Sequence, residues 1–366
     1  MENLVESSLK SFYKGKKVLV TGHTGFKGGW LSLWLYTMGA EVAGFSKDIP
    51  TIPSFFEATQ LNRFLLDFRG EISNYNEIND CLSKFNPSIV FHLAAQPLVI
   101  ESYRSPLITI KSNITGTANL LEACRHCSSV KSLLVVTSDK CYENDESGRP
   151  FSENDKMGGK DLYSASKGCA ELIVNAYRNS FFNPVKYGSE HSVSLATARS
   201  GNVIGGGDWG LYRLFPDCVK NLAENQEIVI RSPHSVRPWQ FVLDPLYGYL
   251  KLGQLLYSEG TRYSGAWNFG PSNENIIKVV DLVEALIKFW EKGSYRTESN
   301  PIDEAKTLIL NTEKANNQLS WFPFYNFENS ITNSANWYKF FYDHPGFDMA
   351  EISINQIKDF IHKTRG

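Results

Sequence analysis

The 366-residue sequence contains no apolar run that approaches the roughly 20 residues of a membrane-spanning helix. Its 37 basic and 39 acidic side chains leave a net charge of −2, and no block of one sign stands out. This balance disfavours binding to nucleic acid or to a membrane surface. Residues 1–17 lack the apolar core of a signal peptide. We therefore expect a cytoplasmic protein without nucleic-acid or membrane partners.

Cysteine is also scarce, because six residues in so long a chain do not make the disulfide framework of small secreted domains. Cys124 and Cys127 form a C-x-x-C, but they lie inside an amphipathic helical pattern. No second pair stands at the spacing of a zinc site. We interpret the two cysteines as reduced thiols near a helix end, and we expect no metal.

Strands and helices alternate in the first half of the chain. Residues 17–46 have the pattern of a strand, a helix and a second strand, with a glycine-rich turn after the first strand. Residues 87–97 and 131–138 are apolar without alternation, which is typical of parallel strands buried on both faces. Helical patterns lie between them. The sequence therefore predicts an α/β fold with a doubly wound parallel sheet of the Rossmann type.

The regular alternation ends at about residue 190. Short strands and glycine-rich loops follow, and the last 40 residues have an aromatic-rich helical pattern. We predict a smaller mixed α/β substrate-binding lobe that is interleaved with the dinucleotide-binding domain. The domain would comprise residues 1–192 and about 236–270, and the lobe would comprise residues 193–235 and about 271–366.

The glycine-rich turn has the pattern G-x-x-G-x-x-G, formed by Gly22, Gly25 and Gly28. Glycines allow a tight turn and the close approach of a pyrophosphate, whose charge then meets a helix N-terminus. Because a strand precedes the turn and a helix follows it, the pattern predicts dinucleotide binding. His23 and Lys27 in the same turn could also meet phosphate, although a surface position for Lys27 is equally compatible with the sequence.

The acidic residue that holds the adenosine ribose is expected about 20 residues after the turn. Ser46, Lys47 and Asp48 compete for this place, and Lys47 could even favour a 2′-phosphate. The residues alone therefore leave NAD and NADP open. Asp67, which we place after the third strand, is a candidate partner for the adenine amino group.

Tyr163 and Lys167 stand four residues apart, so a helix would place them on one face. An unperturbed tyrosine has a pKa of about 10 and is a poor base at neutral pH. A nearby ammonium and a positively charged nicotinamide ring stabilise the phenolate and lower that pKa. The pair is suited to removing a hydroxyl proton while hydride leaves the same carbon. Its position, just after the strand that ends at Ser138, strengthens this interpretation.

The chain resembles the extended short-chain dehydrogenase/reductase superfamily that acts on nucleotide sugars, and within it the CDP-glucose 4,6-dehydratases. The resemblance runs from about residue 17 to 271. Phe241 and Asp244 depart from the family pattern, which has a His and a Glu there, and this bears more on substrate contacts than on chemistry. The segments that carry the resemblance are "VTGHTGFKGGWLSLWL", "HLAAQPLV", "TSDKCYEN", "YSASKGCAEL", "GNVIGGGDW" and "RPWQFVLDPL".

The resemblance implies an intramolecular redox reaction of CDP-glucose. Tyr163 would take the proton of the 4-hydroxyl while hydride passes from C4 to NAD⁺. The new ketone acidifies the C5 hydrogen, water is lost across C5 and C6, and the hydride returns to C6. The product would be CDP-4-dehydro-6-deoxy-glucose, with the cofactor regenerated in place.

This reaction needs an acid and a base in addition to the Tyr–Lys pair. By resemblance, Ser138 would bond O4, protonated Asp139 would donate to the departing 6-hydroxyl, and Lys140 would be the base at C5. A lysine with a pKa of about 10.4 would be protonated, so we expect burial and the nearby Lys167 to lower the pKa of Lys140. The alternative is that Asp139 and Lys140 pair with each other and fix a loop.

The resemblance also implies contacts to the substrate and the cofactor. Asn202 would hold the diphosphate or the sugar, and Arg237 would grip the diphosphate through its planar fork. Arg213 and Arg231 are further candidates that could equally lie on the surface. Asn113 could order the active-site helix through a water. The expected cofactor-binding residues are Gly22, His23, Gly25, Phe26, Gly28, Asp67, Phe68, Leu93, Ala94, Ala95, Tyr163 and Lys167.

Trp209 and Trp239 could pack against the base of the nucleotide, but we favour a place in the core for both. The resemblance further implies a homodimer or a dimer of dimers. The helix expected at residues 113–125 and the helix that carries Tyr163 would form its interface.

Other functions remain possible at this point. A nucleotide-sugar 4-epimerase shares the turn and the Tyr–Lys pair, but it has no use for an acid and a base after the serine. A non-enzymatic NAD-binding scaffold predicts a broken Ser–Tyr–Lys set, whereas Ser138, Tyr163 and Lys167 are all present. A dehydratase of another nucleotide-glucose also stays open, because no residue specifies the base.

Overall fold

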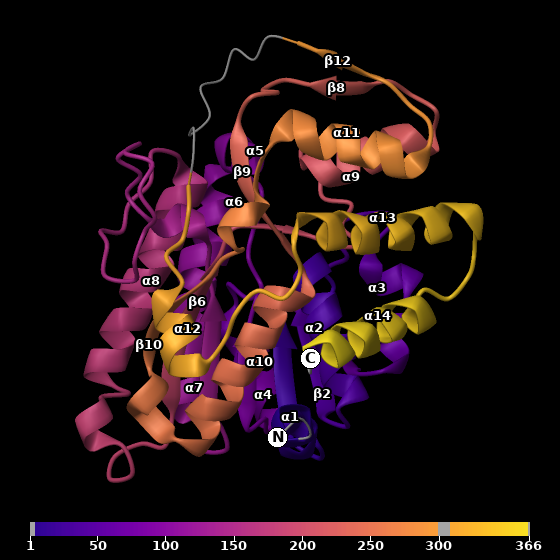
Figure 1. Ribbon diagram of the computed structural model, residues 1–366. Helices are drawn as coiled ribbons and strands as arrows, with labels where there is room; N and C mark the ends of the chain where they lie inside the picture. Colours follow the sequence, from indigo (N-terminus) through magenta and orange to yellow (C-terminus); the bar gives the residue numbers. More distant parts are fainter. Residues whose placement is uncertain (1–3, 299–307, 365–366) are drawn as a thin grey trace.

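The computed structural model describes residues 4–298 and 308–364, and its centre is a parallel sheet (Figure 1). The sheet has seven strands in the order β10-β6-β5-β4-β1-β2-β3, and every neighbouring pair is parallel. The predicted doubly wound α/β fold is confirmed. The strands are β1 (Lys17–Thr21), β2 (Glu41–Ser46), β3 (Leu66–Arg69), β4 (Ile89–His92), β5 (Ser132–Val136), β6 (Ser194–Ser200) and β10 (Gly265–Phe269).

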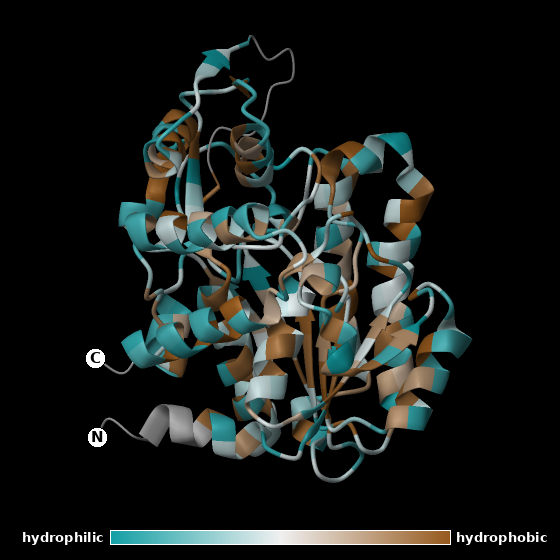
Figure 2. Cartoon of the chain, turned by 90° about the vertical axis from the view of Figure 1, so that its right-hand side faces the viewer, coloured by the Kyte–Doolittle hydropathy of each residue, from teal (hydrophilic) through white to brown (hydrophobic). Residues whose placement is uncertain are grey.

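Two apolar cores lie on opposite faces of this sheet. In β1, Val18 and Val20 belong to one core while Leu19 belongs to the other. Both faces of the sheet are therefore shielded from solvent, which explains why these strands are apolar throughout (Figure 2). The helices of the first face include α1 (Leu4–Tyr13), α2 (Phe26–Thr37) and α10 (Leu243–Ser258), and those of the second face include α4 (Tyr75–Phe85), α7 (Gly116–His126) and α8 (Leu162–Ser180).

The smaller lobe contains two further sheets. In Figure 1 its helices α9 and α11 and its strand pair β8–β12 lie at the far end of the molecule from the N-terminus. One sheet joins β7 (Asn202–Ile204), β9 (Val236–Phe241) and β11 (Ile276–Lys278), and the other joins β8 (Ile228–Ile230) and β12 (Tyr295–Thr297). The principal helices are α9 (Leu214–Ala223), α11 (Val279–Trp290), α13 (Phe327–Asp343) and α14 (Ala350–Lys363).

Short elements connect these parts. The α-helical ones are α3 (Phe55–Ala58), α5 (Val99–Arg104), α6 (Pro106–Ile110) and α12 (Glu313–Leu319). Residues Lys111–Thr115 form a π-helical turn, η2, between α6 and α7. The 3₁₀ turns are η1 (Leu61–Arg63), η3 (Asp139–Cys141), η4 (Pro184–Lys186), η5 (Gly260–Tyr263) and η6 (Asn273–Asn275).

The predicted boundary at residue 192 falls one strand too early. Strand β6 (Ser194–Ser200) pairs with both β5 and β10, so it belongs to the main sheet and not to the lobe. The interleaved division otherwise stays a prediction, and residues 1–3, 299–307 and 365–366 of its two units lie outside the described residues.

Two expectations from composition can be compared with the structure. Cys124 is buried in α7 and Cys127 ends that helix, which is the predicted place of both near a helix end, and all six cysteines are free. Across residues 4–298 and 308–364, none of the helices combines the length and the apolarity that crossing a bilayer requires.

Candidate active site

A large cavity lies where the carboxyl ends of the central strands meet the lobe. Gly22, Leu93 and Ser200 line it from the ends of β1, β4 and β6, and Arg231 lines it from the lobe. Ligands of open α/β sheets bind at this edge, near the point where the strand order reverses. Most of the predicted site residues line this one cavity. They are Gly22, Gly25, Phe26, Gly28, Leu93, Ala94, Ala95, Ser138, Asp139, Lys140, Tyr163, Lys167, Asn202, Arg213, Arg231 and Arg237.

The glycine turn forms a cradle that side chains would fill. Gly22 has φ +79°, and a Cβ there would lie 2.7 Å from the amide nitrogen of Ala94. A Cβ on Gly28 would lie 2.1 Å from the carbonyl oxygen of Gly22. Helix α2 begins directly after Gly25, so its first free N–H groups and its positive dipole end face the cavity. These residues fit the pyrophosphate of a dinucleotide.

The side chains of His23 and Asp67 are bonded to each other within the protein. His23 is fully buried, its Nε2 lies 3.0 Å from Oδ1 of Asp67, and its Nδ1 lies 2.9 Å from Oγ of Ser46. Its ring covers Gly44, where a Cβ would lie 2.2 Å from Cγ of the imidazole. Asp67 lies within β3 rather than after it. His23, Asp67 and Phe68 are absent from the described lining of the cavity, so the structure does not bring these three predicted residues to its wall.

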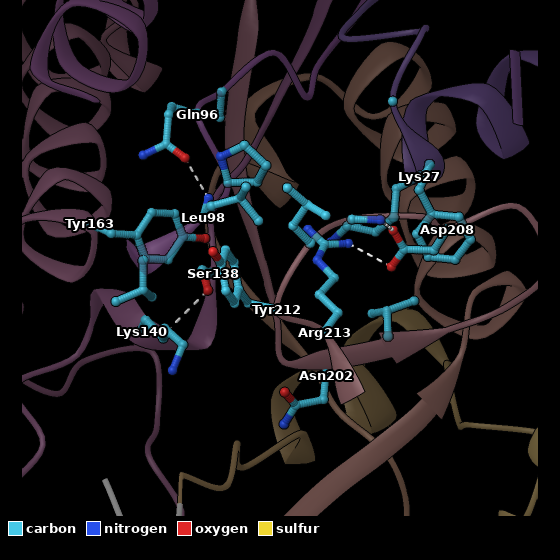
Figure 3. Close-up of a pocket in the computed structure, with 18 of the residues that line it drawn as sticks. Lys27, Gln96, Leu98, Ser138, Lys140, Tyr163, Asn202, Asp208, Tyr212 and Arg213 are labelled. Atoms are coloured by element: carbon cyan, nitrogen blue, oxygen red, sulfur yellow. Dashed lines mark hydrogen bonds and ion pairs between the residues drawn. The ribbon is translucent and has the colours of Figure 1, made fainter. Parts of the chain in front are cut away.

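Lys27 points into the cavity, so the surface alternative for this residue is wrong (Figure 3). Its Nζ donates to Oγ of Ser200 at 3.0 Å, and the same Oγ accepts from the hydroxyl of Tyr249 at 2.8 Å. Burial, followed by the charges of Lys167 and Arg213, lowers the pKa of Lys27 to about 7. A substantial fraction of Lys27 is therefore neutral near neutral pH.

The three candidates for holding the adenosine ribose all line the cavity. The hydroxyl of Ser46 is bonded to His23, and Lys47 forms an ion pair with Glu71 at 3.1 Å. Asp48 accepts a hydrogen bond from Thr24 through its backbone carbonyl, which leaves its carboxylate without a hydrogen bond or ion pair in the described part of the chain. Asp48 is thus the best placed of the three for a ribose.

The serine, the acid and the lysine form a compact turn after β5. Ser138 caps the turn η3: its Oγ accepts from the backbone N–H of Lys140 at 3.3 Å and donates to Oδ1 of Asp139 at 2.9 Å. Asp139 is buried against Gly201, where a Cβ would lie 2.8 Å from Oδ2 of the acid. Burial raises the pKa of Asp139, although the charge of Lys140 opposes this shift. The acid is therefore biased toward its protonated form.

Lys140 lines the cavity, but its side chain is only half-buried, so the predicted burial of Lys140 is wrong. Within the described residues no ion pair joins Lys140 to Asp139, whose carboxylate is bonded by Ser138 instead. The structure therefore lends no support to the alternative in which these two residues only pair and fix a loop.

Helix α8 holds the Tyr–Lys pair on its cavity face. Asp161 is the N-cap residue of this helix, and its side chain accepts from the backbone N–H of Ser164 at 2.9 Å. Burial raises the pKa of Tyr163 to about 12, and a hydrogen bond with Ser138 partly opposes this shift. Burial lowers the pKa of Lys167 to about 8. Tyr163 is therefore protonated and Lys167 mostly cationic in the free protein at neutral pH.

Asn113 ties α8 to the cavity loop through direct hydrogen bonds. Its Nδ2 donates to Oγ of Ser166 at 2.9 Å, and Ser166 lies on α8 between Tyr163 and Lys167. Its Oδ1 accepts from the backbone N–H of Gln96 at 2.8 Å. Asn113 belongs to the π-helical turn η2, a distortion that is frequent at functional sites.

A buried network that the sequence reading missed lies beneath the turn. Nη2 of Arg199 contacts Oε2 of Glu171 at 2.7 Å, and both side chains are 4% exposed. Glu171 also accepts from the hydroxyl of Thr137, and Arg199 donates to the hydroxyl of Tyr142 at 2.6 Å. The turn is thus held at both of its ends. The sequence did contain one signal of this network. Glu171 follows Lys167 by four residues, so the two side chains lie on the same face of helix α8.

Asn202 and three arginines line the lobe side of the cavity. Asn202 lies on β7 and pairs in register with Trp239 of β9, two residues from Arg237. Arg213 directly precedes α9, and its Nη1 contacts Oδ2 of Asp208 at 2.7 Å. Figure 3 shows Asn202 and Arg213 across the cavity from Tyr163 and Ser138. This wall can hold an anionic group close to the Tyr–Lys pair.

The two tryptophans and the two departures from the family pattern lie largely in the core. Trp209 packs against Trp337 and Phe341, with ring centroids 5.6 and 4.9 Å away, and Trp239 is 6% exposed. Both nevertheless reach the cavity edge.

Phe241 and Asp244 are fully buried and are absent from the described cavity lining. Phe241 stacks on Tyr325 with ring centroids 5.1 Å apart, and Oδ1 of Asp244 accepts from the backbone N–H of Phe324 at 2.7 Å. Their departure from the pattern therefore affects packing.

Comparison with known proteins agrees with this geometry. The chain is 45% identical over 357 residues to the CDP-glucose 4,6-dehydratase of Salmonella typhimurium, covering 97% of this chain and 99% of that protein. The fold is that of the dTDP-glucose 4,6-dehydratase of Bacillus anthracis in complex with NAD, with a TM-score of 0.73, 22% identity and coverage of 89% and 97%. The UDP-glucose 4-epimerase of Thermus thermophilus in complex with NAD shares it too, with a TM-score of 0.75, 21% identity and coverage of 88% and 99%.

The resemblance to nucleotide-sugar enzymes of the extended short-chain dehydrogenase/reductase type is confirmed by these relatives. The family model described as GDP-mannose 4,6 dehydratase matches residues 19–334, which include every side chain placed around the cavity above. The chain belongs to the GDP-mannose 4,6 dehydratase family.

Proposed function

We propose that this protein converts CDP-glucose to CDP-4-dehydro-6-deoxy-glucose and water with a bound NAD. The observation that carries the proposal is the turn after β5, where Asp139 and Lys140 stand beside the Ser138–Tyr163 pair. An epimerase uses a tyrosine and a lysine but needs no acid and base for elimination. The 45% identity to the Salmonella enzyme supports the dehydratase and the cytidine nucleotide.

NAD fits the residues at the cofactor end of the cavity. The glycine cradle and the N-terminus of α2 suit the pyrophosphate, and the Asp48 carboxylate suits ribose hydroxyls better than a 2′-phosphate. When bound, NAD⁺ would supply the acceptor for the hydride that leaves C4 and the source of the hydride that is added at C6. Since the hydride stays in the cavity, the residues need only hold the dinucleotide in place during one turnover.

In the oxidation step the protein removes a proton from the 4-hydroxyl. Tyr163 takes this proton, with Ser138 bonded to the same oxygen. The pKa of about 12 for Tyr163 in the free protein makes the phenolate costly, and the Lys167 cation on the same helix face offsets part of this cost. Asn113 fixes Ser166 and with it the turn of α8 that carries both groups.

In the elimination step the C5–H proton passes to the amine of Lys140 while the C6–O bond breaks. Asp139 gives its proton to the departing hydroxyl, which leaves as water. The raised pKa of Asp139 favours the proton-carrying form that this role requires. The half-buried side chain of Lys140 lines the cavity, so its amine can reach a bound sugar. Asn202, Arg213 and Arg237 would hold the diphosphate.

We further propose a cytoplasmic homodimer, or a dimer of dimers, that forms through α6, α7 and α8. Large apolar side chains are exposed on α6 and α8, with 67% exposure for Leu107, 52% for Ile108 and 57% for Leu172. An exposed apolar patch of this kind marks a surface that another chain covers.

The experiment is incubation of the purified protein with CDP-glucose and NAD, followed by mass spectrometry of the nucleotide sugar. Loss of one water supports the dehydratase. An unchanged mass with inversion at C4 would show an epimerase, and no change with any nucleotide-glucose would show a scaffold. Tyr163→Phe, which removes only the phenolic hydroxyl, should abolish the loss of water.

A further inference from the structure

The cavity continues beyond the diphosphate-binding wall along one face of α9. Arg213 precedes this helix, Asp217 follows one turn later, and Asn221 follows another turn later. All three line the cavity. At 1.5 Å rise per residue, Asp217 lies about 6 Å and Asn221 about 12 Å beyond Arg213 along the helix axis. A nucleoside attached to a diphosphate at Arg213 would therefore extend along this face.

The segment around β8 also lines this extension of the cavity. Val229 on β8 offers a half-buried apolar surface, and Gln226 and Arg231 on either side of the strand also line the cavity. The charge of Arg231 acts on the carboxyl of Asp217, so the two side chains lie near each other. A planar guanidinium and an apolar side chain both suit the face of a nucleobase.

The carboxylate of Asp217 is available to a ligand in the cavity. Asp217 is exposed, and in the described part of the chain its carboxylate accepts no hydrogen bond and forms no ion pair. Although the residue as a whole is exposed, partial burial of its carboxyl raises the pKa of Asp217 to about 6, while the charges of Arg231 and then Lys220 oppose this shift. Asp217 is therefore mainly ionised at neutral pH and can only accept hydrogen bonds.

Nucleobases differ in what they offer to such a group. Cytosine presents an exocyclic amine at C4, which donates, and a carboxylate is its natural partner. Uracil and thymine present a carbonyl oxygen at the same position, and guanine presents one at C6. Two acceptors that face each other without a donor lose their hydration and gain no bond. A carboxylate that faces the 4-position of a pyrimidine thus favours cytosine by attraction and disfavours uracil and thymine by repulsion.

We propose that Asp217 is the residue that selects the cytosine nucleotide, by accepting a hydrogen bond from the 4-amine of the base. This inference rests on the proposed function, since it assumes a nucleotide-sugar substrate with its diphosphate at Arg213. It assigns the choice of base to one side chain of α9, and Arg231 supports the face of the same base.

The test measures binding of CDP and UDP to the full-length protein with NAD present, by isothermal titration calorimetry. Wild-type protein should bind CDP more tightly than UDP. In Asp217→Asn the amide can donate to the carbonyl of uracil, so the ratio of the UDP to the CDP dissociation constant should fall about tenfold or more. In Asp217→Ala this ratio should also fall, because CDP loses its hydrogen-bond acceptor and UDP no longer faces a repelling carboxylate.

Glu224→Gln is the matched control, because Glu224 ends the same helix and is absent from the described cavity lining. Its ratio should equal that of wild type. A wild-type protein without preference, an Asp217→Asn ratio within twofold of wild type, or an equal change in the control would each overturn the inference. Failure to dehydrate CDP-glucose would instead overturn the proposed function, while the binding ratio would still test Asp217.

Discussion

Residues with similar chemistry receive different roles from their surroundings. Lys27, Lys140 and Lys167 all line one cavity, yet burial lowers the pKa of Lys27 to about 7 and that of Lys167 to about 8, while Lys140 is half-buried. Sequence reasoning identified Lys140, in the turn after β5, and Lys167, on helix α8, from their motifs. It could not place Lys27 or His23, because both stand in the same glycine turn and only packing decides which one faces the cavity.

We expect Lys140→Met to abolish proton exchange at C5. Methionine matches the length of the lysine side chain but has no amine, so the C5 proton has no acceptor. Exchange of the C5 hydrogen in deuterated water, followed by NMR, should slow by about 100-fold or more. Lys160→Met is the control, since Lys160 lines the same cavity and we assign it no role in the reaction. Exchange at the wild-type rate in Lys140→Met would exclude Lys140 as the base.

His92 should make the protein less stable in acid. It is buried between Thr21 and Thr117, and burial lowers its pKa to about 3. The unfolded chain, with a histidine pKa of about 6.5, binds the proton more readily, so stability is lost as pH falls from about 6.5 toward 3.

The loss from this group between pH 7 and 4.5 is about 3 kcal/mol. Urea unfolding at these two pH values measures it, with His92→Gln as the comparison. A glutamine does not titrate, so its pH dependence should be shallower by this amount. Equal slopes for the two proteins would contradict the assignment.

At the scale of elements, the Glu171–Arg199 pair connects α8 and β6 to the turn after β5. Thr137 and Tyr142 are bonded to the two members of the pair, so the turn cannot move without breaking a buried hydrogen bond. The acid and the base therefore keep a fixed distance from Tyr163. Elimination depends on this distance more than oxidation at C4 does.

Tyr142→Phe should accordingly slow elimination selectively. The substitution removes the hydroxyl that accepts from Arg199, and the ring stays stacked on Phe151. We expect formation of the 4-keto sugar, followed by single-turnover absorbance at 340 nm, to persist while loss of water slows about tenfold. Tyr13→Phe is the control, because it also removes a buried hydroxyl, which donates to Leu250, far from the cavity. Equal slowing of both steps would assign Tyr142 a general structural role.

The elements themselves were largely predictable. The β1–α2–β2 unit, the buried strands β4 and β5, and the helix α8 follow from periodicity and from the glycine turn. The position of β6 in the main sheet could not be predicted, because a run of seven buried residues does not reveal which sheet the strand joins. The π-helical turn that aims Asn113 at Ser166 has no known sequence pattern either, since it results from packing against α8.

At the scale of the whole molecule, exposed leucines on α6 and α8 predict association. Leu172→Glu should place a charge in the proposed interface and convert the dimer to a monomer, which sedimentation velocity can measure. Val185→Glu is the matched control, because Val185 is 92% exposed but lies outside these helices. A wild-type monomer, or a dimer that survives Leu172→Glu, would contradict the proposed interface.

The contact between Asp139 and Gly201 links two segments far apart in the sequence. A Cβ on residue 201 would lie 2.8 Å from Oδ2 of Asp139, so any other residue at this position would force the carboxylate to shift. Glycine at 201 and aspartate at 139 therefore form one unit for protein engineering. A library that varies the loop after β6 without regard to the turn after β5 would lose its active members at this pair.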